Sequence, residues 1–524
     1  MKTKTLLILI TLVSLFLRLY QVNNYPPLLW DEASLGYNAY SVLKTARDEY
    51  GNFLPLILKS FGDYKPGLYI YLAAPFVATL GLSPLSVRLP SILLGSLLPY
   101  FLYLLIVQIS PKSKKLALLS ALVLATNPIN IHFSRGAWET NILTVELVLA
   151  SLFFFKQKYL TSALVFALTL YTYQGGKLSS LLLISILFLL QQKTLLKKPL
   201  IFFRQFILPL FILALPIAYG LFFNPDSNRL KVVSLFSYPR TETETQQIIS
   251  ESGLLDYQIF HSHPLFFFRN FIWRYFNHFS PALLSFVGDW QNPRHSAPYL
   301  GILLYPSLIF LVIGLFSSPK NKLLKKFFLL WLLLAPIPAA LTRDSVQTVR
   351  AMSFSVPLVF FIALGLRQLK NRYLKIFVFL AYLLSFVYYS DLYLNHMVKT
   401  NPMQFIYGQQ QAAKYLIDNQ ANYQQIYFTN FYGQPYIYYL FYSRYPPAQY
   451  QSQANLIENE HGDAGTIQKI DNINFVSTPH PDSLPPHSLA IYSHDELLRL
   501  NLDQKEFTPL SPINNISTFY AYHN

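Results

Sequence analysis

Long apolar runs separated by short basic stretches recur along the first 400 residues of the chain. Several reach the roughly 17–20 residues that an α-helix needs to cross a bilayer. Only 13% of the 524 residues are charged, whereas soluble proteins carry about 25%. The sequence therefore predicts an α-helical polytopic membrane protein. It contains no cysteine, which excludes disulfides and thiolate metal sites.

The positions of lysine and arginine predict how the chain threads the membrane. Lys2 and Lys4 precede the first apolar run and no small-residue cleavage site follows it, so we interpret this run as a retained span with a cytoplasmic N-terminus. Alternation from there gives about eleven spans and an external C-terminus, and every internal loop is basic and free of Asp and Glu. The predicted spans cover residues 5–21, 88–109, 116–131, 141–155, 159–172, 178–190, 200–222, 299–316, 327–341, 351–366 and 376–390.

The parts predicted to lie outside are two long loops, 22–86 and 223–298, and the C-terminal region. Within the first loop, the apolar run 68–80 is too short to span and is interpreted as a re-entrant or interfacial helix. Residues 1–399 are thus predicted to form a transmembrane domain, and 400–524 a small extracytoplasmic α/β domain. Its pattern predicts helices at 409–418 and 433–445 and strands at 425–429, 473–476 and 489–492.

Carboxylates and cations gather on the predicted outer face. Asp31 and Glu32 open a predicted surface helix, and Glu139 follows the third span. A carboxylate can act as general base toward a hydroxyl, and Arg and Lys bind phosphate. A single juxtamembrane cation more often only anchors a span, but together these groups suit an anionic lipid head group. The candidate phosphate-binding cations are Lys65, Arg88, Arg135, Lys177, Arg343 and Arg350.

Other polar residues are given ordinary roles. Asp48, Glu49 and Asp63 are expected to be solvated loop charges, as such residues usually are. The histidines of the second loop lack tight ligand spacing, so no metal site is predicted. Asn515-Ile-Ser517 matches a glycosylation sequon, a pattern that is common by chance.

The order of several short motifs resembles a known family. These are Trp30-Asp-Glu-Ala33, Lys65-Pro-Gly-Leu-Tyr69, Arg88-Leu-Pro-Ser-Ile-Leu-Leu-Gly95, Ser134-Arg-Gly-Ala-Trp-Glu-Thr-Asn141, Pro336-Ile-Pro-Ala-Ala-Leu-Thr-Arg343 and Arg350-Ala351. In this layout the chain resembles the GT-C superfamily of membrane glycosyltransferases, in the branch with protein O-mannosyltransferases and the lipid A aminoarabinose transferase. The resemblance implies a polyprenyl-phosphate sugar donor, Asp31 as base and Lys65 on the donor phosphate. Glu139 stands where many members have Asp.

The predicted function is inverting transfer of a sugar from a polyprenyl-phosphate donor to an acceptor hydroxyl, at the outer face of the plasma membrane. Glu32 is expected to orient Asp31 or to bind a cation. No cofactor is required, although a divalent metal is allowed. The acceptor could be a lipid, a glycan or a protein, and the sugar is open. The net charge of +16 is explained by the internal loops, so no nucleic acid partner is predicted. The alternatives are a lipid-linked sugar transporter or flippase, and a non-catalytic envelope assembly protein.

Overall fold

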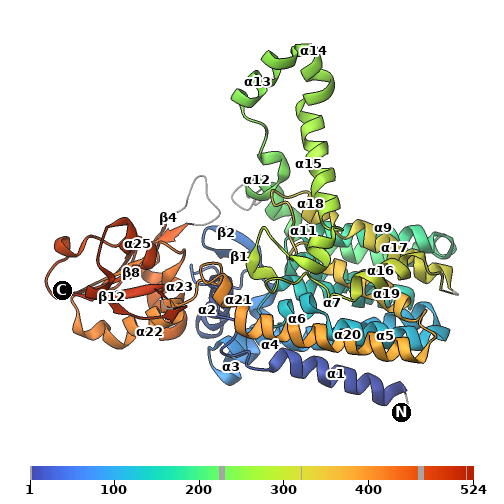
Figure 1. Cartoon of the computed structure of the whole chain (residues 1–524), viewed down its shortest axis with the longest axis horizontal. Coiled ribbons are helices and arrows are strands. Elements are labelled where there is room, and N and C mark those ends of the chain that lie inside the picture. Colours follow the sequence, from blue (N-terminus) through green and yellow to red (C-terminus); the bar gives the residue numbers. More distant parts are fainter. Residues whose placement is uncertain (1–2, 224–229, 320, 458–464, 515) are drawn as a thin grey trace. The chain divides into compact units, whose positions relative to one another are not determined.

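The computed structural model describes residues 3–223, 230–319, 321–457, 465–514 and 516–524 (Figure 1). The chain divides into two compact units. We call Met1–Val13, Leu97–Asn130 and Leu143–Ser390 the helical unit, and Ser14–Ser96, Ile131–Ile142 and Asp391–Asn524 the mixed unit. Part of the second predicted external loop (224–229), one internal-loop lysine (Lys320) and the sequon asparagine (Asn515) lie outside the described residues.

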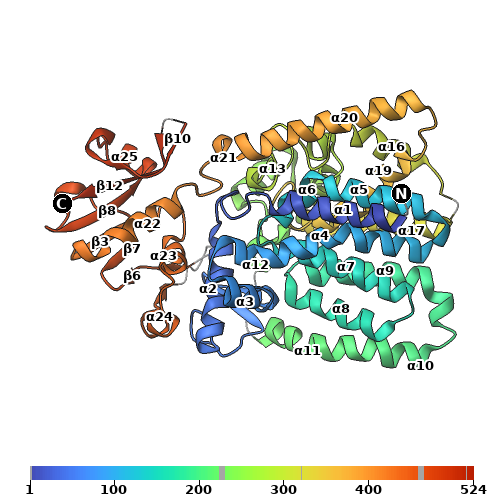
Figure 2. The ribbon, with the colours of Figure 1, turned by 90° about the horizontal axis from the view of Figure 1, so that it is seen from below.

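The helical unit is built from apolar helices that pack along their lengths. Helix α8 packs against α9 and α11, α17 packs on α9, and α19 lies between α5 and α16; Figure 2 shows α8, α9 and α11 side by side. Helices α16 and α19 approach closely, because a Cβ at Gly314 would lie 1.9 Å from the Phe361 carbonyl oxygen. The bounds are α5 Lys114–Thr126, α8 Tyr159–Thr172, α9 Gly176–Leu195, α10 Pro199–Phe202, α11 Leu208–Phe223, α16 Ser307–Phe316, α17 Lys322–Leu334, α18 Ile337–Ala340 and α19 Ser355–Leu366.

Five helical segments among the described residues are long and apolar enough to cross a membrane, or six if one bent pair counts as a span. The five are Pro84–Ile109, Gly176–Leu195, Pro199–Gly220, Lys322–Ala340 and Arg372–Thr400, and the bent pair is Pro111–Thr126 with Pro128–Ser134. Shorter apolar helices cover Leu68–Leu80, Tyr159–Thr172, Ser307–Phe316 and Met352–Leu366. The structure thus confirms a multi-helical apolar chain, while the number of eleven spans and their orientation stay predictions.

Several helices contain residues of both units, because the boundaries between the units fall inside them. They are α1 Thr3–Leu19, α4 Pro84–Ile109, α6 Pro128–Ser134, α7 Glu139–Phe155 and α20 Arg372–Asp391.

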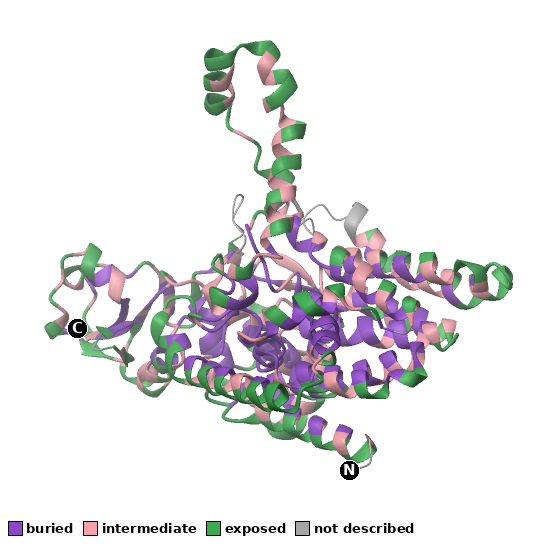
Figure 3. Cartoon of the chain, turned by 45° about the vertical axis from the view of Figure 1, so that its right-hand side comes forward, coloured by how far each residue is buried: buried purple, intermediate pink, exposed green. Residues whose placement is uncertain are grey.

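A helical excursion follows α11 in the helical unit. It contains α12 Leu230–Val233, η4 Leu235–Ser237, α13 Glu242–Ser252, α14 Leu254–Asp256, η5 Tyr257–His261 and α15 His263–Asn277. Figure 3 shows that the α13–α15 part is mainly exposed and half-buried. Two short helical turns, η6 Ala282–Phe286 and η7 Pro293–His295, then lead toward α16, and η8 Met352–Phe354 precedes α19.

The mixed unit contains a six-stranded sheet in the order β6-β7-β3-β8-β12-β9. Strand β3 is parallel to β7 and β8, whereas β12 pairs antiparallel with β8 and β9, and β6 pairs antiparallel with β7. The predicted helices and strands of this region are confirmed. They correspond to α22 Gln409–Asn419, β3 Gln425–Thr429, α23 Pro435–Ser443, β7 Ile473–Val476 and β8 Ser488–Ser493.

The region also contains short helices and strands that were not predicted. The helical ones are η9 Leu392–His396, α21 Met397–Thr400, η10 Gln420–Asn422, α24 Pro447–Gln453, η11 Pro481–Ser483, α25 His494–Arg499 and η12 Gln504–Glu506. The strands are β4 Leu456–Ile457, β5 Thr466–Ile467, β6 Lys469–Ile470, β9 Thr508–Pro509, β10 Pro512–Ile513, β11 Ile516–Ser517 and β12 Phe519–His523.

The first predicted loop and the C-terminal region share one apolar core within the mixed unit. The loop supplies helices α2 Trp30–Thr45 and α3 Leu68–Leu80 and the hairpin of β1 Ile57–Ser60 and β2 Asp63–Pro66. Helix α2 packs on α3, α23 and α24. Buried Tyr37 of α2, Ile70 of α3, Phe428 of β3 and Ile437 of α23 belong to the same cluster. The sequence element that carries Asp31 is therefore held by both regions.

Candidate active site

The first turn of α2 carries the adjacent carboxylates Asp31 and Glu32. Negative charge is favourable at a helix N-terminus, where backbone N–H groups have no helical partner. The Leu29 N–H donates to Glu32 Oε2 at 3.1 Å. Successive residues of a helix point in different directions, so the two carboxylates meet different surroundings.

Glu32 forms a buried pair with Arg88. Arg88 Nε donates to Glu32 Oε1 at 2.8 Å and Nη2 donates to Oε2 at 2.6 Å, and both side chains are almost fully buried. The remaining Arg88 hydrogen bonds go to the carbonyl oxygens of Val22, Pro26 and Pro27. The Ala137 N–H donates to Glu32 Oε1 at 2.8 Å. Glu32 thereby connects the first loop, α4 and the chain before α7, which favours a structural role for both members of the pair.

Asp31 has a more open environment. Lys65 Nζ donates to Asp31 Oδ1, and the Trp30 indole N–H donates to Asp31 Oδ2 at 3.1 Å. The Asp31 side chain is 37% exposed and the Lys65 side chain 16%. Lys65 lies on β2, where pairing with Leu58 of β1 fixes its position. An accessible carboxylate and an ammonium group thus lie in contact within the mixed unit.

Trp30 is held by a glycine of the C-terminal region. Gly433 lies between β3 and α23 with φ +119°, a backbone conformation that residues other than glycine rarely adopt. A Cβ added there would lie 2.0 Å from Trp30 Cζ3. The bare backbone at Gly433 therefore leaves room for the ring that donates to Asp31.

Arg135 and Glu139 belong to the same unit as Asp31 and Lys65 but differ in burial and contacts. Arg135 is buried; its Nη1 and Nη2 donate to the carbonyl oxygens of Leu17 and Tyr25 at 3.0 and 3.1 Å, and Nε donates to the Tyr393 hydroxyl at 3.3 Å. These contacts favour an anchoring role. Glu139 is half-buried in the first turn of α7. Glu32 and Glu139 both act electrostatically on Tyr69 of α3, so the structure brings the three predicted carboxylates into one region of the mixed unit.

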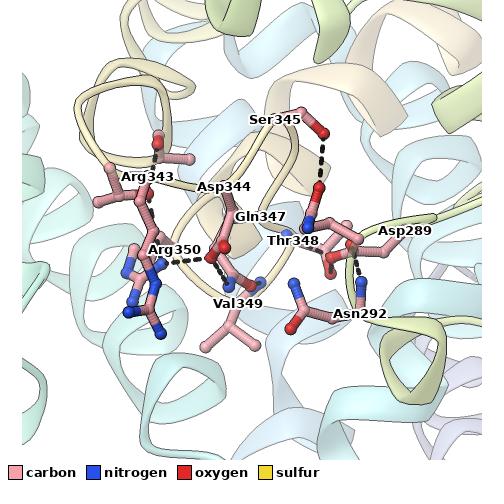
Figure 4. A network of polar contacts seen from close by, with 12 residues as sticks. Asp289, Asn292, Arg343, Asp344, Ser345, Gln347, Thr348, Val349 and Arg350 are labelled. Carbon is pink, nitrogen blue, oxygen red and sulfur yellow. Dashed lines mark hydrogen bonds and ion pairs between the residues drawn. The ribbon is translucent and has the colours of Figure 1, made fainter. Parts of the chain in front are cut away.

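The other three predicted cations belong to the helical unit. Lys177 is in the first turn of α9 and donates to Gln174 Oε1 at 2.6 Å. Arg343 is exposed and donates to the Tyr238 hydroxyl at 2.9 Å. Arg350 Nη1 donates to Asp344 Oδ2 at 3.1 Å and to Thr342 Oγ1 at 3.3 Å. Figure 4 shows the side chains of Arg343 and Arg350 together on the loop between α18 and α19.

This arginine-bearing loop is anchored on Asp289, a residue that sequence reasoning did not assign to the site. Asp289 is buried, and its Oδ2 accepts hydrogen bonds from Thr348 N at 3.0 Å and Thr348 Oγ1 at 2.8 Å (Figure 4). His295 Nδ1 lies 3.2 Å from the same oxygen. Burial opposes ionisation, but hydrogen bonds from His295 and Thr348 hold the pKa of Asp289 below its usual value. The only signal in the sequence is an acid in the polar stretch before α16.

The expectation that Asp48 and Glu49 are solvated is wrong, because both residues are fully buried. Glu49 Oε1 accepts from Asn38 Nδ2 at 3.0 Å, while the Glu49 N–H donates to Asn38 Oδ1 at 2.9 Å. Burial raises the pKa of Glu49 to about 8. Asp48 instead accepts from the N–H groups of Tyr50 and Asn52 at 3.0 and 2.9 Å. The sequence pattern of a polar turn does not show that Asn38 of α2 and Gln451 of the C-terminal region form hydrogen bonds with it.

Within the described ranges no group of three or more His, Cys, Asp or Glu side chains is arranged to hold a metal ion.

Comparison with known proteins shows which proteins this chain resembles. The model of the dolichyl-phosphate-mannose-protein mannosyltransferase family matches residues 8–230, a range that contains all the predicted site residues except Arg343 and Arg350. No curated protein matches the sequence. This match supports the resemblance to the GT-C superfamily of membrane glycosyltransferases and the prediction that the chain is an enzyme.

Two solved structures share the fold over nearly the whole chain. ArnT from Cupriavidus metallidurans in the apo state is 12% identical, with a TM-score of 0.56, and the match covers 99% of this chain and 97% of that one. The same protein bound to undecaprenyl phosphate is 11% identical, with a TM-score of 0.51 and the same coverage. At these identities the likeness concerns the fold.

Proposed function

We propose that this protein is an inverting glycosyltransferase that moves a sugar from a polyprenyl-phosphate donor to an acceptor hydroxyl on the extracytoplasmic face of the plasma membrane. One observation carries the proposal: of two adjacent carboxylates, Glu32 is sequestered by Arg88, while Asp31 stays accessible beside Lys65. A base and a phosphate-binding cation side by side are what transfer from a lipid phosphate requires.

In the proposed reaction Asp31 accepts the proton of the acceptor hydroxyl. The acceptor oxygen attacks the anomeric carbon from the face opposite the phosphate, and the bond from that carbon to the phosphate oxygen breaks. Polyprenyl phosphate leaves with the bonding electrons, and Lys65 stabilises its charge. No nucleotide takes part because the sugar is already activated. Glu32 and Arg88 hold α2 in place, and Glu139 supplies a further carboxylate near the acceptor.

The other elements of the proposal follow the charge pattern. Lys177, Arg343 and Arg350 stay predicted phosphate-binding cations, whereas Arg135, whose guanidinium is bonded within the mixed unit, is proposed to anchor that unit. Eleven spans with the N-terminus inside would place both loops and the C-terminal region outside. A protein of the same fold binds undecaprenyl phosphate, as its structure is described, which supports a polyprenyl-phosphate donor here. The proposal needs no metal, and it leaves the sugar and the acceptor open.

The test is Asp31→Asn in the full-length protein, assayed in liposomes with undecaprenyl-phosphate-linked sugars. Loss of a general base lowers turnover about 10²–10⁴-fold, and Lys65→Ala should raise the donor concentration needed for half-maximal rate. Asp63→Asn is the matched control, because Asp63 is a carboxylate of the same strand as Lys65. Full transfer activity in Asp31→Asn would refute the assignment of the base.

Wild-type protein that moves the lipid-linked sugar across the bilayer without any transfer product would refute the proposal in favour of transport. If the protein neither transfers the sugar nor moves the lipid-linked sugar across the bilayer, and the full-length chain captures an envelope component, an assembly role would be favoured.

A further inference from the structure

The α13–α15 excursion of the helical unit has its largest apolar side chains on the outside. Leu265, Phe268, Trp273 and Phe276 of α15 are all exposed, and they recur every three to five residues along the helix. A helix that faces water would carry polar residues at these positions. The preceding turns add four more large apolar side chains, so that eight side chains are between 41% and 71% exposed: Leu254, Leu255, Ile259, Phe260, Leu265, Phe268, Trp273 and Phe276.

The direction of α15 distinguishes it from the candidate spans. In Figure 1, α15 runs across the direction of α5 and α20, and α20 belongs to the candidate span Arg372–Thr400. The C-terminal end of α15 is fixed to the last turn of α17, which belongs to the candidate span Lys322–Ala340, since the Tyr275 hydroxyl donates to the Leu333 carbonyl oxygen at 2.8 Å. Arg274 Nη2 donates to the Arg343 carbonyl oxygen at 3.1 Å. The helix therefore leaves the unit where a span ends and extends crosswise from there.

Charge is distributed unevenly along the excursion. Arg269 is exposed between Phe268 and Trp273, and Arg240 lies over the Phe266 ring at 4.8 Å and donates to the His261 carbonyl oxygen. The acids are mostly on α13, which carries Glu242, Glu244 and Glu251. Aromatic side chains with interspersed arginine are typical of helices at the boundary of lipid head groups and acyl chains.

We propose that residues 254–276 lie on the surface of the lipid bilayer, with the exposed apolar side chains in the acyl boundary and Arg269 on anionic head groups. The bilayer surface fits all three observations: an apolar outer face, a direction across the spans, and an exposed arginine on that face. The one acid of the segment, Asp256, lies 3.5 Å from His261. This interaction is independent of the transfer reaction.

The test uses site-directed spin labelling, because the chain has no cysteine. Phe268→Cys, labelled with a nitroxide in the full-length protein, is reconstituted in vesicles of phosphatidylcholine and phosphatidylglycerol. Gln246→Cys, exposed on α13, is the matched control. The label at position 268 should collide severalfold more with oxygen than with a water-soluble nickel complex, and the label at position 246 should show the reverse.

Equal nickel access at the two positions would overturn the proposal, and so would protection at position 268 from both reagents, which signals packing against protein. A second measurement avoids the substitution at Phe268. Brominated lipids should quench wild-type tryptophan fluorescence more than that of Trp273→Phe, and equal quenching would also count against the proposal.

Discussion

At the scale of single residues, the neighbouring carboxylates Asp31 and Glu32 differ in burial, and we propose different roles for them. Glu32 is buried against Arg88, so Glu32→Ala leaves a guanidinium buried without its carboxylate, and we expect a loss of about 3–5 kcal/mol. The Asp31–Lys65 pair is partly exposed, so Asp31→Asn should cost at most about 1 kcal/mol while turnover falls. Thermal unfolding of the purified variants in one detergent measures both effects. A similar fall in Tm for both variants would contradict this division of roles.

Glu49 should make stability depend on pH. Its pKa is about 8 in the folded protein against 4.5 without the fold, so between these values the unfolded chain releases a proton that the folded chain keeps. The folded state then binds more protons, and stability falls as pH rises through this window. Glu49→Gln removes this effect.

The measurement for Glu49 is Tm at pH 5.5 and pH 8.5. The variant should gain most over wild type at pH 8.5. Burial also raises the pKa of Asp48, so part of the slope should persist in Glu49→Gln, and Asp63→Asn should retain all of it. A wild-type advantage that grows with pH would contradict the prediction.

At the scale of elements, the contact of the β3–α23 turn with α2 gives the C-terminal region a positioning role. Gly433→Ala combines a strained φ with displacement of Trp30, whose indole donates to Asp31. We expect it to lower kcat by about tenfold, the effect of a displaced base, with little change in KM. Gly408→Ala is the matched control: its φ is +98° and its Cβ would meet Thr518 Oγ1 at 2.3 Å, far from Trp30 in sequence and contacts. Equal losses in both variants would mean general destabilisation.

The sequence predicts well those helices and strands whose signals lie within the element or next to it. Strand β3 has the predicted bounds 425–429, and α3 has the predicted bounds 68–80, because periodicity and flanking breakers are local signals. The Gly433 contact with Trp30 and the Asp289 bonds to Thr348 join segments far apart in the chain. No rule of residue spacing predicts such contacts.

At the scale of the whole molecule, helix length and charge pattern give different information about the membrane. Helices such as α8 and α16 are 14 and 10 residues long, shorter than the roughly 17–20 residues of a straight span. In the predicted topology such helices are completed by turns, so helix length alone gives a lower count of spans than the charge pattern. The basic loops do not depend on helix length, because lysine and arginine mark the cytoplasmic side wherever a helix ends.

The predicted topology can be tested with single cysteines in the cysteine-free chain. Lys193 follows the sixth predicted span and Asp482 follows the eleventh, so eleven spans put these exposed positions on opposite sides of the membrane. A membrane-impermeant maleimide should label Asp482→Cys in intact spheroplasts, and Lys193→Cys only after permeabilisation. Gln246→Cys, in the second predicted external loop, should behave like Asp482→Cys. Labelling of positions 193 and 482 from the same side requires an even number of spans between them and contradicts the prediction, because five spans separate the two positions in the proposed topology.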